Sequence, residues 1–126
     1  MSITVNSLVV DCHDPQAVAR FWSAALDWPI FLETDDEVLI APFDQPRPGV
    51  VPVLFGRNPD QKQTKIRWHF DLAPSDQAAE VARLEELGAK RVDIGQKDVS
   101  WVVMVDIEGN EFCVLESLPA ELPSSA

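Results

Sequence analysis

The strongest constraint on the fold is a repeat, because the order strand, helix, strand, strand, strand is predicted twice along the 126-residue chain. Apolar periodicity and turn residues mark these elements. In the first copy we predict a strand over 3–12, a helix from Asp14, and strands over 29–33, 37–41 and 50–55. In the second copy we predict a strand over 65–73, a helix ending near Gly88, and strands over 89–94, 100–106 and 111–116. The copies are offset by about sixty residues, so that Ser7 to Asp14 aligns with His69 to Asp76.

One such copy cannot bury both its helix stripe and a face of its sheet, whereas two copies side by side can. We therefore predict an α+β fold in which two βαβββ modules form a curved mixed sheet, with a concave ligand cup and the helices on the convex side. A single domain over 1–126 would contain module one at about 3–55, module two at about 65–116 and a tail at 117–126. A ferredoxin-like α+β sandwich is the alternative.

Both helices carry recognisable ends. Asp14 is a natural N-cap with Pro15 at the first helical position, and Ser75 or Asp76 has the same role in module two. Gly88 is a typical helix stop. The first helix places apolar residues at spacings of three and four, which predicts a buried stripe; its members are Val18, Phe21, Trp22, Ala25 and Leu26.

The net charge of −11 argues against a nucleic-acid partner and against anionic membranes, because both require a basic surface. The chain has two cysteines, too few to predict a disulfide framework. The first residues, MSITVNSLVV, lack a basic segment and a long apolar run, so we predict neither a signal peptide nor a membrane span. A reduced, cytoplasmic setting is the simplest expectation.

Candidate site residues lie in the stretch RWHFDL, 67–72, which alternates polar and apolar residues as a half-buried strand does. Arg67, His69 and Asp71 share one face, and Trp68 and Phe70 are expected in the core. His69 is predicted either to contact a ligand or to act as a base. In the structural alternative, His69 bonds a backbone carbonyl, and Asp11 and Asp71 pair with Arg67 or cap loop amides. The equivalent faces elsewhere carry Ser7, Asp11, Glu111 and Cys113, and Trp101 is a candidate for the wall of a pocket.

Three segments carry a resemblance to a known family: LVVDCHDPQAVARFWSAALDW, LEELGAKRV and WVVMVDIEGNEFCVLES. In this order the chain resembles, over about residues 3–116, the glyoxalase/bleomycin-resistance/dioxygenase group (the vicinal oxygen chelate superfamily), and within it the glyoxalase-like subgroup. Ile107 stands where the family usually has proline. The resemblance implies a cup that binds a small molecule, a homodimer, and in many members a divalent metal held by His, Gln or Glu.

Carried over residue by residue, the family's metal positions fall on Ser7, His69, Cys113 and a residue near Val51. Only His69 is a usual ligand of the family, so we expect no cofactor and no metal. If a divalent metal does bind, His69 and Glu111 are the expected ligands. This departure puts glyoxalase I or extradiol dioxygenase activity in doubt, because both chemistries need the metal.

Three functions remain open. The first is metal-free binding of a small organic molecule in the cup. The second is a lyase, isomerase or dioxygenase acting on a small oxygenated substrate, with His69 as catalytic base or metal ligand. The third is a structural dimer without a ligand. The predicted ligand-contacting residues are Ser7, Asp11, Arg67, His69, Asp71, Trp101, Glu111 and Cys113.

Overall fold

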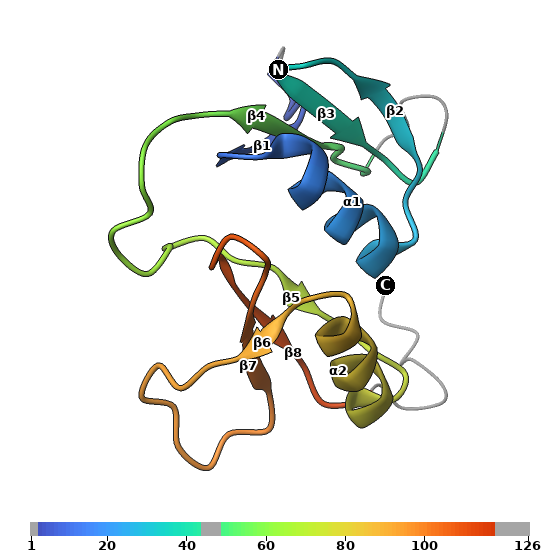
Figure 1. The fold of residues 1–126 in the computed structure, drawn as a ribbon. Helices are drawn as coiled ribbons and strands as arrows, with labels where there is room; N and C mark the ends of the chain where they lie inside the picture. The colour runs from blue at the N-terminus through green and yellow to red at the C-terminus, as the bar shows by residue number, and fades with distance from the viewer. Residues whose placement is uncertain (1–2, 44–48, 118–126) are drawn as a thin grey trace. The chain divides into compact units, whose positions relative to one another are not determined.

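The computed structural model describes residues 3–43 and 49–117, which fall in two compact units, Met1–Gln61 and Lys62–Ala126. Each unit holds one four-stranded mixed sheet and one helix (Figure 1). The predicted α+β class and the duplicated βαβββ order are confirmed. The predicted tail over 117–126 lies, apart from Ser117, outside the described residues.

The first unit runs β1 (Leu8–Cys12), α1 (Pro15–Leu26), β2 (Ile30–Glu33), β3 (Glu37–Ile40) and β4 (Val53–Arg57). The strand order in its sheet is β1-β4-β3-β2. The pair β1 and β4 is parallel, and the other two pairs are antiparallel. A parallel neighbour needs a long crossover, which α1 and the two intervening strands provide.

The second unit repeats this topology with β5 (Asp71–Leu72), α2 (Gln77–Glu86), β6 (Lys90–Arg91), β7 (Val102–Val105) and β8 (Glu111–Val114). Its strand order is β5-β8-β7-β6, with β5 parallel to β8 and the other two pairs antiparallel. Each strand therefore has the place of its counterpart in the first unit, as the repeat predicted.

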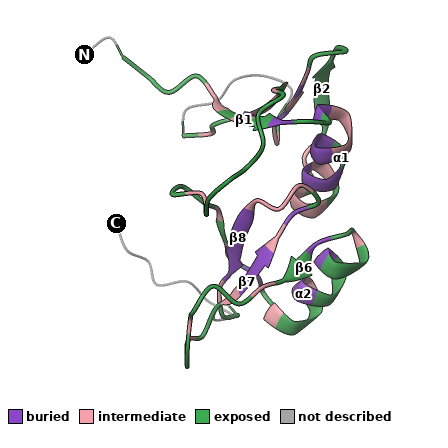
Figure 2. Cartoon of the chain, turned by 60° about the vertical axis from the view of Figure 1, so that its left-hand side comes forward, coloured by how far each residue is buried: buried purple, intermediate pink, exposed green. Residues whose placement is uncertain are grey.

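The core of each unit comes from the apolar stripe of its helix and the alternating residues of its strands (Figure 2). In the first unit Val18, Phe21 and Trp22 of α1 are buried, as predicted, and the Phe21 and Trp22 rings meet edge to face at 5.1 Å. The buried strand residues there are Val38, Ile40, Val53 and Phe55, and in the second unit Val81, Leu84, Val103, Met104, Phe112 and Val114 are buried.

Matching aspartates begin the two helices. The Asp14 carboxylate accepts a hydrogen bond from the Ala17 amide at 3.1 Å, and the Asp76 carboxylate accepts one from the Ala79 amide at the same distance. Both contacts satisfy an amide that the first helical turn leaves without an intrahelical partner. Both predicted caps are confirmed, with Asp76 rather than Ser75 in the second unit.

The strand predicted over 3–12 is shorter than expected. It begins at Leu8, whose amide donates to the Pro52 carbonyl at 2.9 Å. Pro52 has no N–H to donate to the segment before Leu8, so regular pairing starts one residue later, at Val53. The partner strand, predicted over 50–55, accordingly spans Val53–Arg57.

The strand predicted over 65–73 is the largest correction. Only Asp71–Leu72 forms β5, and Trp68, predicted in the core, is 84% exposed. The Glu111 carboxylate binds Lys62 and the Ile66 amide, so the chain before β5 contacts β8 through a side chain rather than through a backbone ladder. The strand predicted over 89–94 is likewise reduced to Lys90–Arg91.

No helix among residues 3–43 and 49–117 has the length and apolar character needed to cross a membrane. The concave cup and the continuous curved sheet shared by the two modules stay predictions.

Candidate functional site

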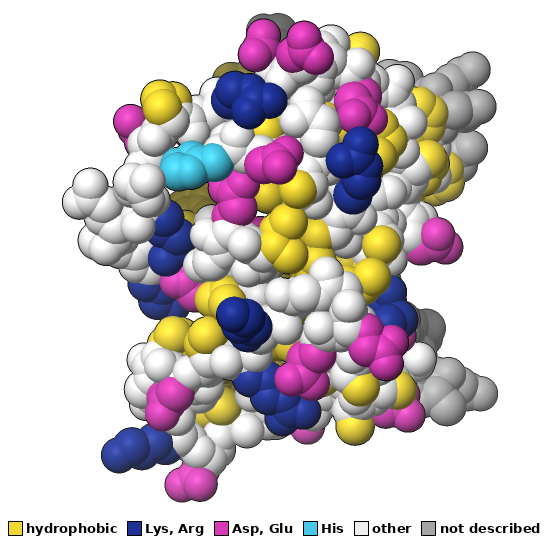
Figure 3. Space-filling view, in the orientation of Figure 1, with side chains coloured by type: hydrophobic (Ala, Val, Ile, Leu, Met, Phe, Trp, Pro, Cys, Tyr) yellow, Lys and Arg dark blue, Asp and Glu magenta, His cyan; other side chains and the backbone are white. Residues whose placement is uncertain are grey.

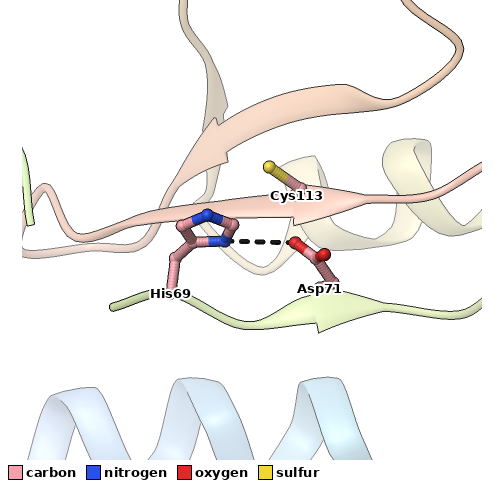
Figure 4. Close-up of side chains that lie close together, drawn as sticks. All are labelled: His69, Asp71 and Cys113. Carbon is pink, nitrogen blue, oxygen red and sulfur yellow. Dashed lines mark ion pairs between the residues drawn. The ribbon is translucent and has the colours of Figure 1, made fainter. Parts of the chain in front are cut away.

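Three side chains of different chemistry meet in the second unit: the imidazole of His69, the carboxylate of Asp71 and the thiol of Cys113 (Figure 4). One nitrogen, oxygen or sulfur atom from each lies within 4.8 Å of the others. His69 Nδ1 lies 3.1 Å from Asp71 Oδ1. We name these three residues the His69 cluster.

The parallel pairing of β5 with β8 builds the cluster. Asp71 lies opposite Cys113 in the strand register, and the Cys113 amide donates to the Phe70 carbonyl at 2.9 Å. Residues opposite each other on neighbouring strands project from the same face, which brings the carboxylate to the thiol. His69 precedes Asp71 by two residues and shares its face, as the alternation in RWHFDL predicted.

Burial differs across the cluster. The Cys113 residue is 8% exposed, whereas the side chains of His69 and Asp71 are 33% and 52% exposed. Burial raises the pKa of the Cys113 thiol above its ordinary value of 9.0, and the charge and hydrogen bond of Asp71 raise this pKa further, against a smaller opposing effect of Lys65. The thiol is therefore neutral at physiological pH, and the open side of the cluster is formed by imidazole and carboxylate.

Glu111 lies on the same face of β8 as Cys113 but has a different partner. Its buried carboxylate lies 3.0 Å from Lys62 Nζ and accepts the Ile66 amide at 3.4 Å. Burial opposes its ionisation, but the Lys62 hydrogen bond, backbone amides and the Lys62 charge outweigh burial and hold the pKa of Glu111 below its ordinary value. Among the described residues, the group of possible metal ligands is His69, Asp71 and Cys113, and Glu111 is not a member.

The donor set of the His69 cluster is one that a zinc-type divalent ion accepts. Nitrogen, carboxylate oxygen and thiolate sulfur are all zinc ligands, and three protein ligands leave a fourth tetrahedral position open, as in catalytic sites. Tetrahedral ligands around zinc are separated by roughly 3.3–3.8 Å, so small rotamer changes within the cluster suffice. These residues fit such an ion, which would act there as a Lewis acid on a bound oxygen.

The other predicted site residues have separate surroundings. Ser7 precedes β1 and its hydroxyl accepts a 3.4 Å hydrogen bond from Asn6, while Asp11 lies exposed on β1 opposite Gly56. Both belong to the first unit. In the second unit Arg67 is exposed, and Trp101 is 41% exposed just before β7. Asp71 pairs with His69, and His69 Nδ1 also lies 3.4 Å from the Phe70 carbonyl, which is the backbone contact that the structural alternative predicted for this ring.

Sequence reasoning missed Lys62 and Ile66. Lys62 belongs to the polar stretch DQKQTK, which has no apolar periodicity that would place it over a strand. Its partner is the buried Glu111, 49 positions later in the sequence, and only the folded chain shows this ion pair.

The family described as the glyoxalase-like domain matches residues 7–115. No curated protein sequence matches the chain.

Three solved structures have similar folds at low sequence identity. A glyoxalase/bleomycin resistance protein/dioxygenase family enzyme from Burkholderia phytofirmans has a TM-score of 0.69 at 13% identity, covering 92% of this chain and 100% of its own. A fosfomycin resistance protein variant from Listeria monocytogenes, complexed with Mn(II) and 1S,2S-dihydroxypropylphosphonic acid, has a TM-score of 0.69 at 10% identity, with 94% and 93% covered.

The third is the bleomycin-binding protein from Streptomyces verticillus complexed with copper(II)-bleomycin, with a TM-score of 0.58 at 14% identity, covering 94% of this chain and 99% of its own. At these identities the likeness concerns the fold alone, and it agrees with the duplicated βαβββ topology. Since the family match spans most of the sequence, the chain belongs to the glyoxalase-like domain family.

Proposed function

We propose that this protein binds a small, oxygen-bearing organic molecule at the His69 cluster, without a metal. The observation that carries the proposal is the partly exposed His69–Asp71 pair beside a neutral, buried Cys113 thiol. A pair of polar groups above a more apolar floor is the usual composition of a small-molecule site.

The His69–Asp71 contact defines what the imidazole offers. When Nδ1–H donates to the Asp71 carboxylate, the neutral ring has its lone pair at Nε2. This nitrogen is then an acceptor for a hydroxyl group of a ligand. The exposed guanidinium of Arg67, two residues before His69 in the sequence, could supply positive charge for a carboxylate or enolate oxygen.

The state of Cys113 supports the metal-free form of the proposal. A metal binds the thiolate, not the thiol, and the environment of Cys113 disfavours the thiolate. The solved relatives support the ligand class, because one is complexed with a dihydroxypropylphosphonic acid and another with copper(II)-bleomycin.

The chain offers a matched control for the test, because it has one histidine in each unit. His13 is exposed and contacts the Asp60 carbonyl at 2.8 Å, outside the His69 cluster. We would screen uncharged diols and phenols against the metal-stripped protein by amide NMR. Binding should perturb the amides of His69, Asp71 and Cys113, and His69→Ala should weaken it at least about tenfold, while His13→Ala should leave it unchanged.

Two results would contradict the proposal. One is saturable binding that His69→Ala and His13→Ala affect equally. The other is binding that appears only after a divalent metal is added to the stripped protein.

The second result would favour an alternative function, a metal-dependent lyase, isomerase or dioxygenase, which the donor set of the His69 cluster also fits. Cobalt(II) titration distinguishes the two, because a cobalt–thiolate bond gives an intense near-ultraviolet absorption band. In the alternative this band forms with wild type and Cys12→Ser but is lost in Cys113→Ser. Cys12 is the matched control, since it is also buried and lies in the first unit.

We also propose that the protein assembles as a homodimer. β2 is an edge strand whose four residues are all exposed, and three of them are the apolar Ile30, Phe31 and Leu32. Figure 3 shows hydrophobic side chains exposed among charged ones on one face of the molecule. An exposed apolar edge favours pairing with another chain. Light scattering coupled to gel filtration should give twice the 14.0 kDa chain mass, and Leu32→Lys should shift it toward the monomer.

A further inference from the structure

The first unit contains an open hollow that is independent of the His69 cluster. Its volume is about 490 Å³, which is within the range of small-molecule pockets. It is formed where the ends of β1 and β4 meet the β2–β3 turn, and it is lined by His13, Asp36, Arg57, Asn58 and Pro59.

Arg57, the last residue of β4, is held in place by three neutral acceptors. Nη1 donates to the His13 carbonyl at 2.9 Å, and Nη2 donates to the Asp35 carbonyl and to Gln16 Oε1 at 3.3 Å. These acceptors come from the segment after β1, from α1 and from the β2–β3 turn. The guanidinium is therefore fixed before any ligand arrives, which lowers the entropic cost of using it.

The charge of this guanidinium is only weakly compensated. The Asp36 carboxylate lies 3.8 Å from Nε, which is longer than a hydrogen bond, and the Asp36 side chain is 87% exposed. A guanidinium has five N–H donors, and three are used by the neutral acceptors. Within the described part of the chain, Nε–H and one Nη1–H remain for a further acceptor.

His13 and Pro59 complete the wall. His13 Nε2 contacts the Asp60 carbonyl at 2.8 Å, which fixes the plane of the ring at the hollow. The imidazole and pyrrolidine rings offer flat, weakly polar surfaces next to the cation. A ligand that fits has one negative, planar group and a small hydrocarbon part.

We propose that this hollow binds a small organic carboxylate, with the carboxylate at Arg57 Nε and the hydrocarbon part against His13 and Pro59. The carboxylate can accept Nε–H in a charge-assisted hydrogen bond, and a single negative charge meets less repulsion than a phosphate dianion in a protein of net charge −11. The incoming carboxylate displaces the Asp36 carboxylate, which is free to rotate into solvent because of its exposure.

Benzoate is the probe for the test, followed through the Arg57 Nε–Hε and Asn58 amide NMR signals of the full chain at low salt. We expect saturable chemical-shift changes with a Kd in the millimolar range, because benzoate is a small fragment that makes one charged contact. Arg57→Lys should weaken binding at least about fivefold, because Lys lacks Nε–H and cannot be held in place by the same three acceptors. Asp36→Asn should tighten it about threefold, because it removes the competing carboxylate.

Arg91 provides the matched control. Its Nε also lies 3.8 Å from a carboxylate, that of Glu85, but it does not line the hollow. Arg91→Lys should leave benzoate binding unchanged. The opposite signs at Arg57 and Asp36 separate a binding site from a purely structural role for Arg57, which would not predict tighter binding in Asp36→Asn.

Absence of saturable shifts at Arg57 and Asn58, or equal effects of Arg57→Lys and Arg91→Lys, would overturn the proposal. Inorganic phosphate binding as tightly as benzoate would overturn the assignment to carboxylates. If Arg57→Lys fails to fold, Asp36→Asn and His13→Ala still test the proposal. Unchanged benzoate binding in both variants would contradict the proposed contacts.

Discussion

The ammonium of Lys62 lies 3.0 Å from the carboxylate of Glu111, and the Glu111 side chain is only 8% exposed. This ion pair fastens the beginning of the second unit to the face of β8 that also carries Cys113. Ile66 donates its amide to the same carboxylate. Lys62 and Ile66, which both precede His69, therefore depend on the one buried charge of Glu111.

Replacing Lys62 by methionine should strongly destabilise the second unit. The variant retains the aliphatic stem but leaves a buried carboxylate without its cation, which typically costs about 3–5 kcal/mol, and the partial exposure of Lys62 places the expected loss near the lower bound. Urea unfolding followed by circular dichroism measures it. Lys65→Met is the control, because the hydrogen bond of Lys65 among the described residues is to a backbone carbonyl, that of Ile66, and a comparable loss there would contradict the assignment.

The same ion pair predicts a pH dependence. The pKa of Glu111 is lowered in the folded chain, so its contribution to stability is present above the ordinary value of 4.5 and is lost as the pH falls through the lower folded value. In Lys62→Met the carboxyl group takes up a proton more easily, which relieves the buried charge. The difference in unfolding free energy between wild type and variant should therefore shrink below pH 4.5; a constant difference from pH 7 to pH 3 would argue against it.

The raised pKa of Cys113 predicts a titration above that of an ordinary thiol. Burial first and Asp71 second favour the neutral thiol, so the midpoint of the Cys113 ¹³Cβ shift against pH should lie above 9.0. Asp71→Asn should lower this midpoint, because it removes the negative charge. Stability from this group is full below pH 9.0 and is lost as the pH rises through the folded value. A midpoint that Asp71→Asn leaves unmoved would mean that burial alone is responsible.

Gly88→Ala should destabilise the turn after α2 by about 1–3 kcal/mol. The φ of Gly88 is +117°, and an added Cβ would lie 3.0 Å from Ile107 Cγ2. Gly95 distinguishes backbone strain from the steric contact with Ile107, because its φ is +98° and nothing lies within 4 Å of an added Cβ. Thermal unfolding should show a larger loss for Gly88→Ala than for Gly95→Ala, and Ile107→Ala should recover part of the excess. Equal losses would leave backbone strain as the whole effect.

The sequence predicted the frame better than the site. Local signals such as Asp14, Pro15 and Gly88 depend on neighbouring residues only, and the repeat aligned His69 with Ser7 and placed Asp71 on the His69 face. The sequence could not predict that Lys62 would bind Glu111, because that contact joins distant segments and shortens the strand before Asp71. The exposure of Trp68 follows from the same event, since a residue outside the ladder no longer has a sheet face to pack against.

The brevity of β5 gives the two sides of the His69 cluster different dynamics. Cys113 and Leu115 donate their amides to Phe70 and Leu72 and lie on or beside a buried central strand, so their protons should exchange with solvent slowly. Trp68 and His69 lie before β5, outside its backbone hydrogen bonds with β8, so their amide protons should exchange with solvent quickly. We therefore expect slow amide exchange on the Cys113 side of the cluster and fast amide exchange on the His69 side, a contrast that hydrogen-exchange measurements resolve residue by residue.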